Sequence, residues 1–146
     1  MDIKYAEGYC PREDLAYLAG IIDGDGSICI IYNKKKDNYY AKVAVGMTDK
    51  APIDLLCAIF PSHMWADKLK SGKTIWKWHT VYSNVVPFLR AIYEFLRVKK
   101  EQADIIFEFF SVECKHRRQG LPEEEKKRRK QLCEKLRQLH RGGDFD

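Results

Sequence analysis

A chain of 146 residues that is 45% hydrophobic and 32% charged has the size and composition of one globular domain, expected here over residues 1–146. It contains no run of about 18 apolar residues, which excludes a membrane-spanning helix. Lysine and arginine number 26 against 21 acidic residues, and the net charge of +5 is compatible with nucleic-acid binding without establishing it.

The cysteines and the N-terminus bear on the compartment. The five cysteines are scattered and form no CxxC pair, so no disulfide framework is expected. Cys114 and His116 are close in sequence, but a structural zinc site needs more convergent ligands than these two. The segment Met1–Tyr5 lacks the apolar stretch of a signal peptide. We therefore expect a reducing intracellular location, either a prokaryotic or phage cytoplasm or an organelle that encodes the protein.

The first predicted element is a helix that begins near Pro11. Proline is favoured in the first helical turn, and Glu13 and Asp14 complement the positive end of the helix dipole. Apolar residues recur at helical spacing along this segment. Gly24 and Gly26 mark its end, because glycine readily adopts the conformations found at helix C-termini.

Two hairpins follow, separated by a short helix. Short apolar or alternating runs bounded by polar turns are typical of strands, and Gly72 lies in the second of the two turns. Pro52 and Pro61 delimit the helix between the hairpins. The predicted strands are Ser27–Tyr32, Tyr39–Met47, Met64–Leu69 and Thr74–Val81, and the helix is Ile53–Phe60.

The remainder of the chain is predicted to be helical. One helix covers Asn84–Leu96, a second covers Lys100–Cys114, and a third covers residues 121–141 after a break at Gly120. The second is expected to bury Ala103, Ile106, Phe107 and Phe110. Antiparallel hairpins with helices on one face predict an α+β fold with a core over residues 10–115.

The segment Leu18–Gly26 carries the main candidate site. Ala16 and Gly20 are small residues four positions apart, and they would let a second helix approach closely. Asp23 and Asp25 end the helix, and carboxylate oxygens there suit magnesium. The alternative is that these Asp-Gly pairs are ordinary turn residues.

The run Leu18-Ala19-Gly20-Ile21-Ile22-Asp23-Gly24-Asp25-Gly26 resembles the signature of the LAGLIDADG homing endonucleases. The resemblance implies an αββαββα core with a curved antiparallel DNA-binding sheet and additional C-terminal helices. Family members with one copy of the motif act as homodimers, with their motif helices packed at the two-fold axis. The residues expected at that interface are Ala16, Ala19, Gly20 and Asp23.

The resemblance also implies an active site. Asp25 is expected to bind a divalent cation, with the Gly24 carbonyl as a second ligand, and Lys99 to orient water or stabilise charge on the phosphate. Lys100 competes for that role. Asp49 occupies a position where many relatives have glutamine, so it either positions water or lies near the metal. The family has a further basic residue just downstream, which corresponds here to Ile53 or its neighbours. These cannot replace it, and Lys50 is a possible substitute.

Strand alternation, combined with the resemblance, predicts which side chains face DNA. Trp76 and Trp78 are placed inward, so the lysines that alternate with them face outward. Each lysine alone could be a solvent-exposed side chain, and the block Lys126–Lys130 could contact flanking phosphates or be a solvated helix face. The residues expected on the DNA side are Cys29, Ile31, Asn33, Lys35, Tyr40, Lys42, Ala44, Lys68, Lys70, Lys73, Lys77 and His79.

The function implied by the resemblance is that of an intron-encoded, homodimeric DNA endonuclease. It would require magnesium or another divalent cation, cut both strands of a long, near-palindromic site and leave 3′ overhangs. The alternative is a cleavage-inactive relative, either a maturase that binds its own intron RNA or a DNA-binding regulator. The presence of Asp25 favours the nuclease, whereas Asp49 and Ile53 keep the alternative open.

Overall fold

A computed structural model describes residues 10–112 and 120–142 of the chain. The element order confirms the predicted αββαββα core followed by C-terminal helices. The core elements are α1 Arg12–Asp25, β1 Gly26–Asn33, β2 Asn38–Met47, α2 Lys50–Ile59, β3 His63–Lys68, β4 Thr74–Val81 and α3 Val85–Ile92. The short 3-10 helices η1 Tyr82–Asn84 and η2 Tyr93–Phe95 flank α3, and α4 Lys100–Phe109 and α5 Glu123–Gly142 complete the described chain.

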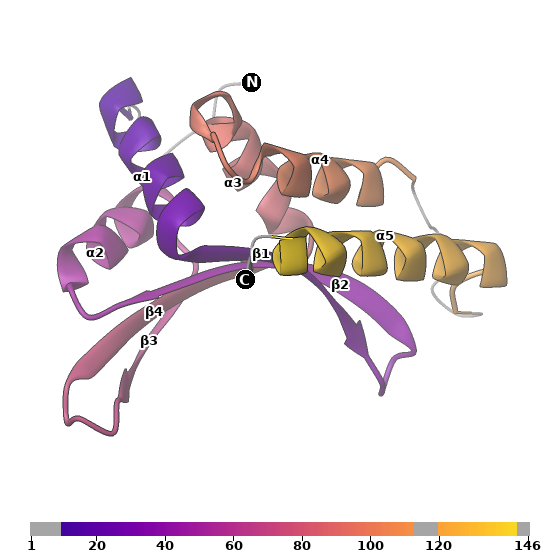
Figure 1. Ribbon diagram of the computed structural model, residues 1–146, viewed down its shortest axis with the longest axis horizontal. Coiled ribbons are helices and arrows are strands. Elements are labelled where there is room, and N and C mark those ends of the chain that lie inside the picture. The colour runs from indigo at the N-terminus through magenta and orange to yellow at the C-terminus, as the bar shows by residue number, and fades with distance from the viewer. Residues whose placement is uncertain (1–9, 113–119, 143–146) are drawn as a thin grey trace.

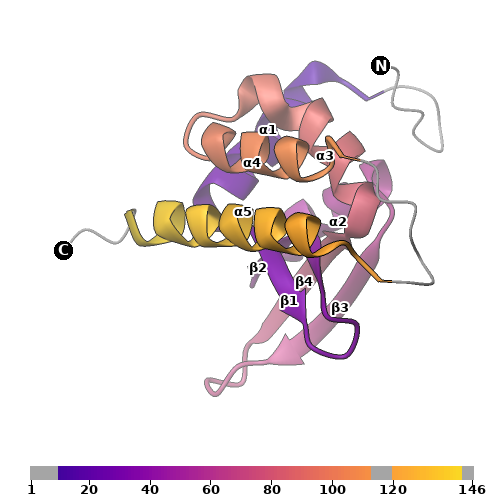
Figure 2. The ribbon, with the colours of Figure 1, turned by 90° about the vertical axis from the view of Figure 1, so that its right-hand side faces the viewer.

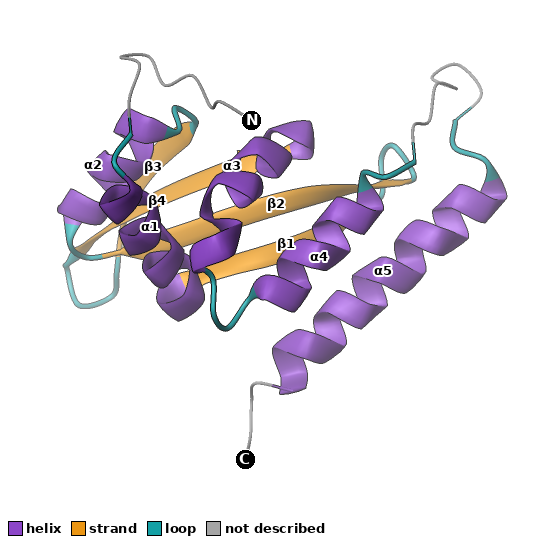
Figure 3. Ribbon diagram, turned by 90° about the horizontal axis from the view of Figure 1, so that it is seen from above, coloured by secondary structure: helices purple, strands orange, loops and turns teal. Residues whose placement is uncertain are grey.

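The four strands form one antiparallel sheet in the order β1-β2-β4-β3. The helices lie over one face of this sheet, and the sheet arches so that its two hairpins descend on either side of the molecule (Figure 1). Seen from above, α4 and α5 run side by side over the β1 end of the sheet (Figure 3). We call the face without helices the uncovered face.

Strand alternation places the apolar core between the sheet and the helices. Ile28, Val43 and Trp78 point toward the helices and are fully buried. The Trp78 ring lies 5.0 Å from the Phe88 ring, and its indole Nε1 donates a hydrogen bond to the Phe60 carbonyl at 3.2 Å. The prediction that the tryptophans of β4 point inward is confirmed, with Trp76 partly buried.

Two of the predicted helices are shorter in the structure. Residues 84–96 form α3 between two 3-10 turns, and the Leu96 N–H closes the second turn on Ile92 and Tyr93. Leu96 is thereby buried in the core at 1% exposure. The helix predicted to reach Cys114 ends at Phe109, because the Glu108 carbonyl accepts hydrogen bonds from the Ser111 main chain and hydroxyl. Cys114 and His116 lie outside the described residues.

The buried face of α4 is wider than predicted because α5 packs against it. Ile105 and Phe109 are buried together with the expected Ala103 and Ile106, whereas Phe107 and Phe110 are only partly buried. On α5, the apolar side chains of Leu132, Cys133 and Leu136 join the same core. None of the described helices is long and apolar enough to cross a membrane.

Candidate functional site

The end of the motif helix α1 contacts the segment just before α4. The contacting residues Asp23 and Lys99 are 76 positions apart in the sequence. The Asp23 carboxylate accepts hydrogen bonds from the main-chain N–H groups of Arg97 at 2.8 Å, Val98 at 3.2 Å and Lys99 at 3.0 Å. These bonds occupy the carboxylate within its own chain. The motif aspartate at position 23 therefore fixes the loop before α4 against the end of α1.

Lys99 is the lysine that reaches the motif. Its Nζ donates a hydrogen bond to the main-chain carbonyl of Asp23 at 2.7 Å, and the residue is half-buried. Lys100 instead places its Nζ 5.4 Å from the centre of the Tyr93 ring. Of the two lysines that the sequence left in competition, Lys99 is the one held beside the motif, and its catalytic role stays a prediction.

Asp25 differs from Asp23 in having an exposed carboxylate with no hydrogen bond or ion pair to any residue in the described part of the chain. It contributes to a cavity of about 250 Å³ that opens beside the sheet. The other side chains of this cavity include Lys42 of β2, Trp65 of β3 and Lys77 of β4. The Asp25 carboxylate and the main-chain carbonyl of the exposed Gly24 supply hard oxygen ligands of the kind that magnesium prefers.

Asp49, Lys50 and Ile53 lie at the start of α2. Asp49 is the exposed N-cap residue of α2, and its side chain makes no capping hydrogen bond. Lys50 lies 3.8 Å from Asp54 and 4.9 Å from the centre of the Trp76 ring. Ile53 is fully buried in the core. None of the three contributes to the cavity beside Asp25.

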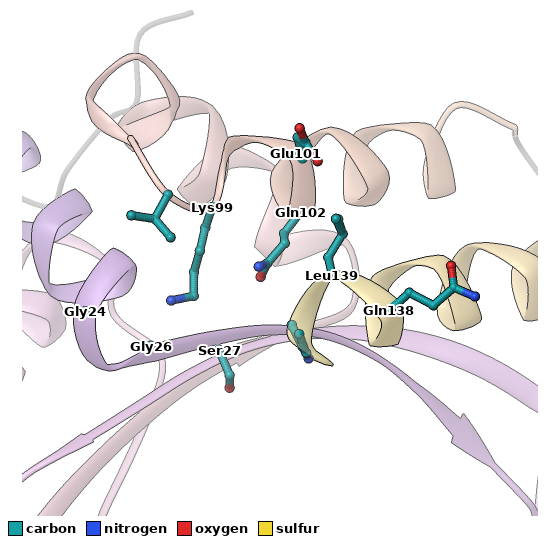
Figure 4. Close-up of a pocket in the computed structure, with 10 residues that line it drawn as sticks. Gly24, Gly26, Ser27, Lys99, Glu101, Gln102, Gln138 and Leu139 are labelled. Carbon is teal, nitrogen blue, oxygen red and sulfur yellow. The ribbon is translucent and has the colours of Figure 1, made fainter. Parts of the chain in front are cut away.

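A larger cavity of about 720 Å³ lies between the end of α1, the start of α4 and the end of α5. Figure 4 shows Lys99, which immediately precedes α4, and Gln102 of α4 extending toward the junction of α1 and β1. Gln102 is 8% exposed, and its Oε1 has no hydrogen-bond partner in the described structure. His140 of α5 also lines the cavity, and its buried Nε2 is likewise unpartnered among the described residues.

Sequence reasoning missed both Gln102 and His140. Gln102 could have been found, because it is a polar residue on a helix face that otherwise buries Ala103, Ile105 and Ile106. His140 offered no comparable signal, since its place depends on how α5 crosses the sheet.

The uncovered face brings together most of the residues predicted to face DNA. Cys29 pairs with Lys42, Ala44 pairs with His79, and Ile31 pairs with Tyr40, so these side chains share one face across three strands. All of them are only partly buried, while the inward-facing Ile28, Ile30, Val43 and Trp78 are buried. Toward the tip of the first hairpin, the inward-facing Tyr39 is partly buried and Tyr32 is exposed. The predicted orientation of β1, β2 and β4 is confirmed, and contact with DNA stays a prediction.

An aromatic cluster on the uncovered face was not predicted. The His79 ring centre lies 5.1 Å from that of His63 and 4.9 Å from that of Trp65. Lys77 forms an ion pair with Asp67 at 3.0 Å and lies 6.0 Å from the centre of the Trp65 ring. Burial lowers the pKa of His79, and the charges of Lys42 and His63 lower it further.

The structure corrects the placement of two predicted surface residues. Ala19 is fully buried in the core, so the exposed side of α1 carries Tyr17, Gly20 and Gly24 instead. Lys68 pairs with Thr74, which places it on the same side of the sheet as the inward tryptophans. Strand β3 has no clear apolar alternation, and its orientation is fixed only by pairing with β4.

The remaining predicted DNA contacts lie at the hairpin tips. Asn33 accepts main-chain hydrogen bonds from Lys35 at 3.1 Å and Lys36 at 3.4 Å, and it thereby closes the turn of the first hairpin. The Lys35 side chain is exposed there. Lys70 and Lys73 are exposed at the turn of the second hairpin rather than within a strand.

No family model matches the chain, and no curated protein matches it by sequence. Solved structures do match it. The homing endonuclease I-CvuI, in complex with its target and calcium, superposes with a TM-score of 0.64 and 17% identity over 88% of this chain and 82% of that one. A second I-CvuI structure, with DNA and magnesium, gives 0.61 and 19% over 88% and 85%. The archaeal intron-encoded homing endonuclease I-Vdi141I, complexed with DNA, gives 0.71 and 15% over 87% and 84%.

These matches confirm at the level of the fold what the motif predicted. The chain has the fold of the LAGLIDADG homing endonucleases, and the similarity covers 87–88% of its length.

Proposed function

We propose that the chain is a site-specific DNA endonuclease of the LAGLIDADG type. The observation that carries this proposal is the exposed carboxylate of Asp25 at the end of the motif helix, which has no partner among residues 10–112 and 120–142. It lies beside an arched sheet face that carries Lys42 and Lys77. Structures with the same fold are complexes with DNA.

The uncovered face has the shape and charge that suit DNA. An antiparallel β-ribbon fits the major groove, and the two descending hairpins would each follow part of it (Figure 1). Lys42 and Lys77 lie in the middle of the face, while Lys35, Lys70 and Lys73 lie at the hairpin tips. Lysines at the tips would contact phosphates, and side chains within the strands would read bases.

The residues at the end of α1 fit a divalent cation. Asp25 and the Gly24 carbonyl would hold it, leaving water and phosphate oxygens to complete its coordination. When bound, such an ion activates water and stabilises the charge of the phosphate during hydrolysis. Lys99 would place its ammonium group beside the same helix end, where it opposes negative charge on the phosphate. Asp49 would position water from the start of α2.

A second copy of the chain would complete the active site. Tyr17, Gly20 and Gly24 are exposed along one side of α1, and a Cβ atom added at either glycine would meet no atom within 4 Å. With partly buried Ala16 beside them, these small residues allow two α1 helices to cross closely. Two symmetric copies predict a long, near-palindromic site that is cut on both strands. The resemblance to the LAGLIDADG endonucleases adds 3′ overhangs and a protein that is encoded within an intron.

Cleavage-inactive binding of DNA or of the chain's own intron RNA is the second candidate. It is favoured by the burial of Ile53 where the family has a basic residue, and by the contacts of Lys50 with Asp54 and the Trp76 ring. In that case the arched face and the dimer would be retained, whereas Asp25 would have no catalytic role.

The two candidate functions differ in whether the protein cuts the DNA that it binds. The purified chain is incubated with a randomised DNA library and magnesium, and the cut ends are captured and sequenced. We expect a single long site with approximate two-fold symmetry and 3′ overhangs, absent from the Asp25→Asn reaction and retained with Asp54→Asn, which changes an exposed acid on α2. If a selected site is bound yet never cut by the parent protein, the endonuclease proposal fails.

A further inference from the structure

The outer half of the β1–β2 hairpin has only two strands. Pairing of β2 with β4 extends from Lys42 to Met47, whereas pairing with β1 continues outward to Asn38. A two-stranded hairpin is marginally stable by itself. The outer residues, which include Ile31 and Tyr40 of the uncovered face, therefore need support from outside the sheet.

Helix α5 supplies contacts at the tip of this hairpin. The Asp37 carboxylate accepts a hydrogen bond from the Tyr32 hydroxyl at 2.5 Å and lies 2.6 Å from Nζ of Lys126. The Arg129 guanidinium donates a hydrogen bond to Oδ1 of the neighbouring Asn38 at 2.7 Å. Figure 2 shows the start of α5 lying beside the β1–β2 hairpin. Two adjacent tip residues are thus each held by a cation of α5.

The start of α5 is itself fixed to the body of the protein. Glu125 is 8% exposed and forms ion pairs with Arg128 at 2.9 Å and with Arg129 at 3.1 Å. Arg129 also lies 4.7 Å from the centre of the Phe109 ring, and Arg128 donates a hydrogen bond to the Glu108 carbonyl. The basic block Lys126–Lys130 is therefore engaged within the chain at three of its five positions.

The ion pair with Lys126 also compensates the negative charge of the Asp37 carboxylate at the hairpin tip. Asp37 follows the three lysines of residues 34–36, and its φ of 46° turns the chain back into β2. The hydrogen bond from Lys126 lowers the pKa of Asp37, and the bond from Tyr32 lowers it further. Without Lys126, a negative charge would lie among lysines that would otherwise attract phosphate.

We propose that α5 is a brace that fixes the outer half of the β1–β2 hairpin for reading the outer part of a DNA half-site. Lys126 and Arg129 are its positioning residues. This inference rests on the proposed function, because it assumes that the uncovered face binds DNA. It assigns the basic block a role in orienting a recognition element rather than in contacting phosphate.

The first test is made on the free protein, by hydrogen exchange of the main-chain amides of residues 33–40. Lys126→Met and Asp37→Asn should speed exchange there by roughly 5-fold at most, because the ion pair that each removes is exposed to solvent. Lys126→Arg should restore slow exchange. The matched control is Lys127→Met, which changes an exposed lysine one position along the helix. Equal exchange in parent and Lys126→Met would overturn the brace.

The second test uses the selected DNA site and its single-base-pair variants. Lys126→Met should lose several-fold discrimination at the outer base pairs of each half-site, while discrimination at the inner pairs and the cleavage rate on saturated DNA stay unchanged. Faster exchange with unaltered outer discrimination would overturn the role in DNA readout. Absence of selective DNA binding by the parent would overturn the proposed function itself, and the exchange measurement would still decide whether the brace exists.

Discussion

Asp23 and Lys99 are joined by two hydrogen bonds, each between the side chain of one residue and the main chain of the other. The Asp23 carboxylate accepts the main-chain N–H of Lys99 at 3.0 Å, and Nζ of Lys99 donates to the main-chain carbonyl of Asp23 at 2.7 Å. This reciprocal contact sets the position of the helix end from which Asp25 projects. The two aspartates of the motif are therefore assigned different tasks, one structural and one proposed to be catalytic.

Asp23→Ala should destabilise the fold by about 2 kcal/mol, because three main-chain N–H groups lose a charged acceptor. The loss would be measured as the change in the free energy of unfolding in urea. Asp25→Ala is the matched control, and it should leave that free energy unchanged because the Asp25 carboxylate is exposed and unpartnered in the described structure. Equal stability of the two variants would contradict the structural role of Asp23.

Gly26→Ala should cost about 1–3 kcal/mol, as overpacking in a close-packed region does. A Cβ atom at position 26 would lie 2.8 Å from the Cα of Ile22, and main-chain atoms of a helix cannot move aside cheaply. Gly24→Ala is the control, because its Cβ would meet no atom within 4 Å. Urea unfolding of both variants tests the difference, and a fully stable Gly26→Ala protein would show that the contact is not this close.

Gly20→Leu should convert the proposed dimer into a monomer without loss of the fold. The glycine is exposed on α1, so a leucine fits the single chain but prevents close approach of a second motif helix. Sedimentation velocity reports the association state, circular dichroism reports the fold, and Asp54→Leu on α2 serves as the control. A parent protein that sediments as a monomer, or a Gly20→Leu variant that remains dimeric, would refute this interface.

The stability of the protein should increase with pH through the range in which His79 titrates. Burial, followed by the charges of Lys42 and His63, lowers the pKa of His79 below its ordinary value of 6.5 in the folded state. The unfolded chain therefore binds more protons in the window between the folded pKa and about 6.5, and stability is lost as the pH falls through that window. Asp37 and Asp67 have lowered pKa values and act in a separate range, below about pH 4.

Urea unfolding of the parent and of His79→Gln, at several pH values across that window, tests the assignment. The variant should lose most of the slope. If the slope persists in the variant, a group other than His79 is responsible for it.

The faces of three strands could be predicted from the sequence because their alternation is regular. Val43 and Trp78 are apolar and point inward, while Lys42 and Lys77 alternate with them and point outward. Strand β3 lacks this pattern, so the orientation of Lys68 could be known only from its pairing with Thr74. The burial of Ala19 shows a similar limit, since an alanine suits both a core and a helix interface.

Other features depended on contacts between distant segments. The spacing of the motif predicted where α1 ends, but no local pattern reveals that Asp23 would accept bonds from residues 97–99. The basic residues of α5 could be assigned neither to solvent nor to DNA from their sequence, because their partners Asp37 and Asn38 lie in the first hairpin. Gln102 and His140 line the same cavity because α5 packs over the sheet beside α4, which their sequence positions do not indicate.

The proposed endonuclease activity is tested most directly by cleavage of the selected DNA site by Asp25→Asn in magnesium, with binding to the same site measured alongside in calcium. The exposed position of Asp25 predicts a folded variant with parental affinity, and its proposed role in holding the cation predicts at least a 100-fold loss of cleavage rate, on the order of the effect of losing a key catalytic electrostatic group. Cleavage by Asp25→Asn at the parental rate would contradict the proposed role of Asp25 in holding the cation.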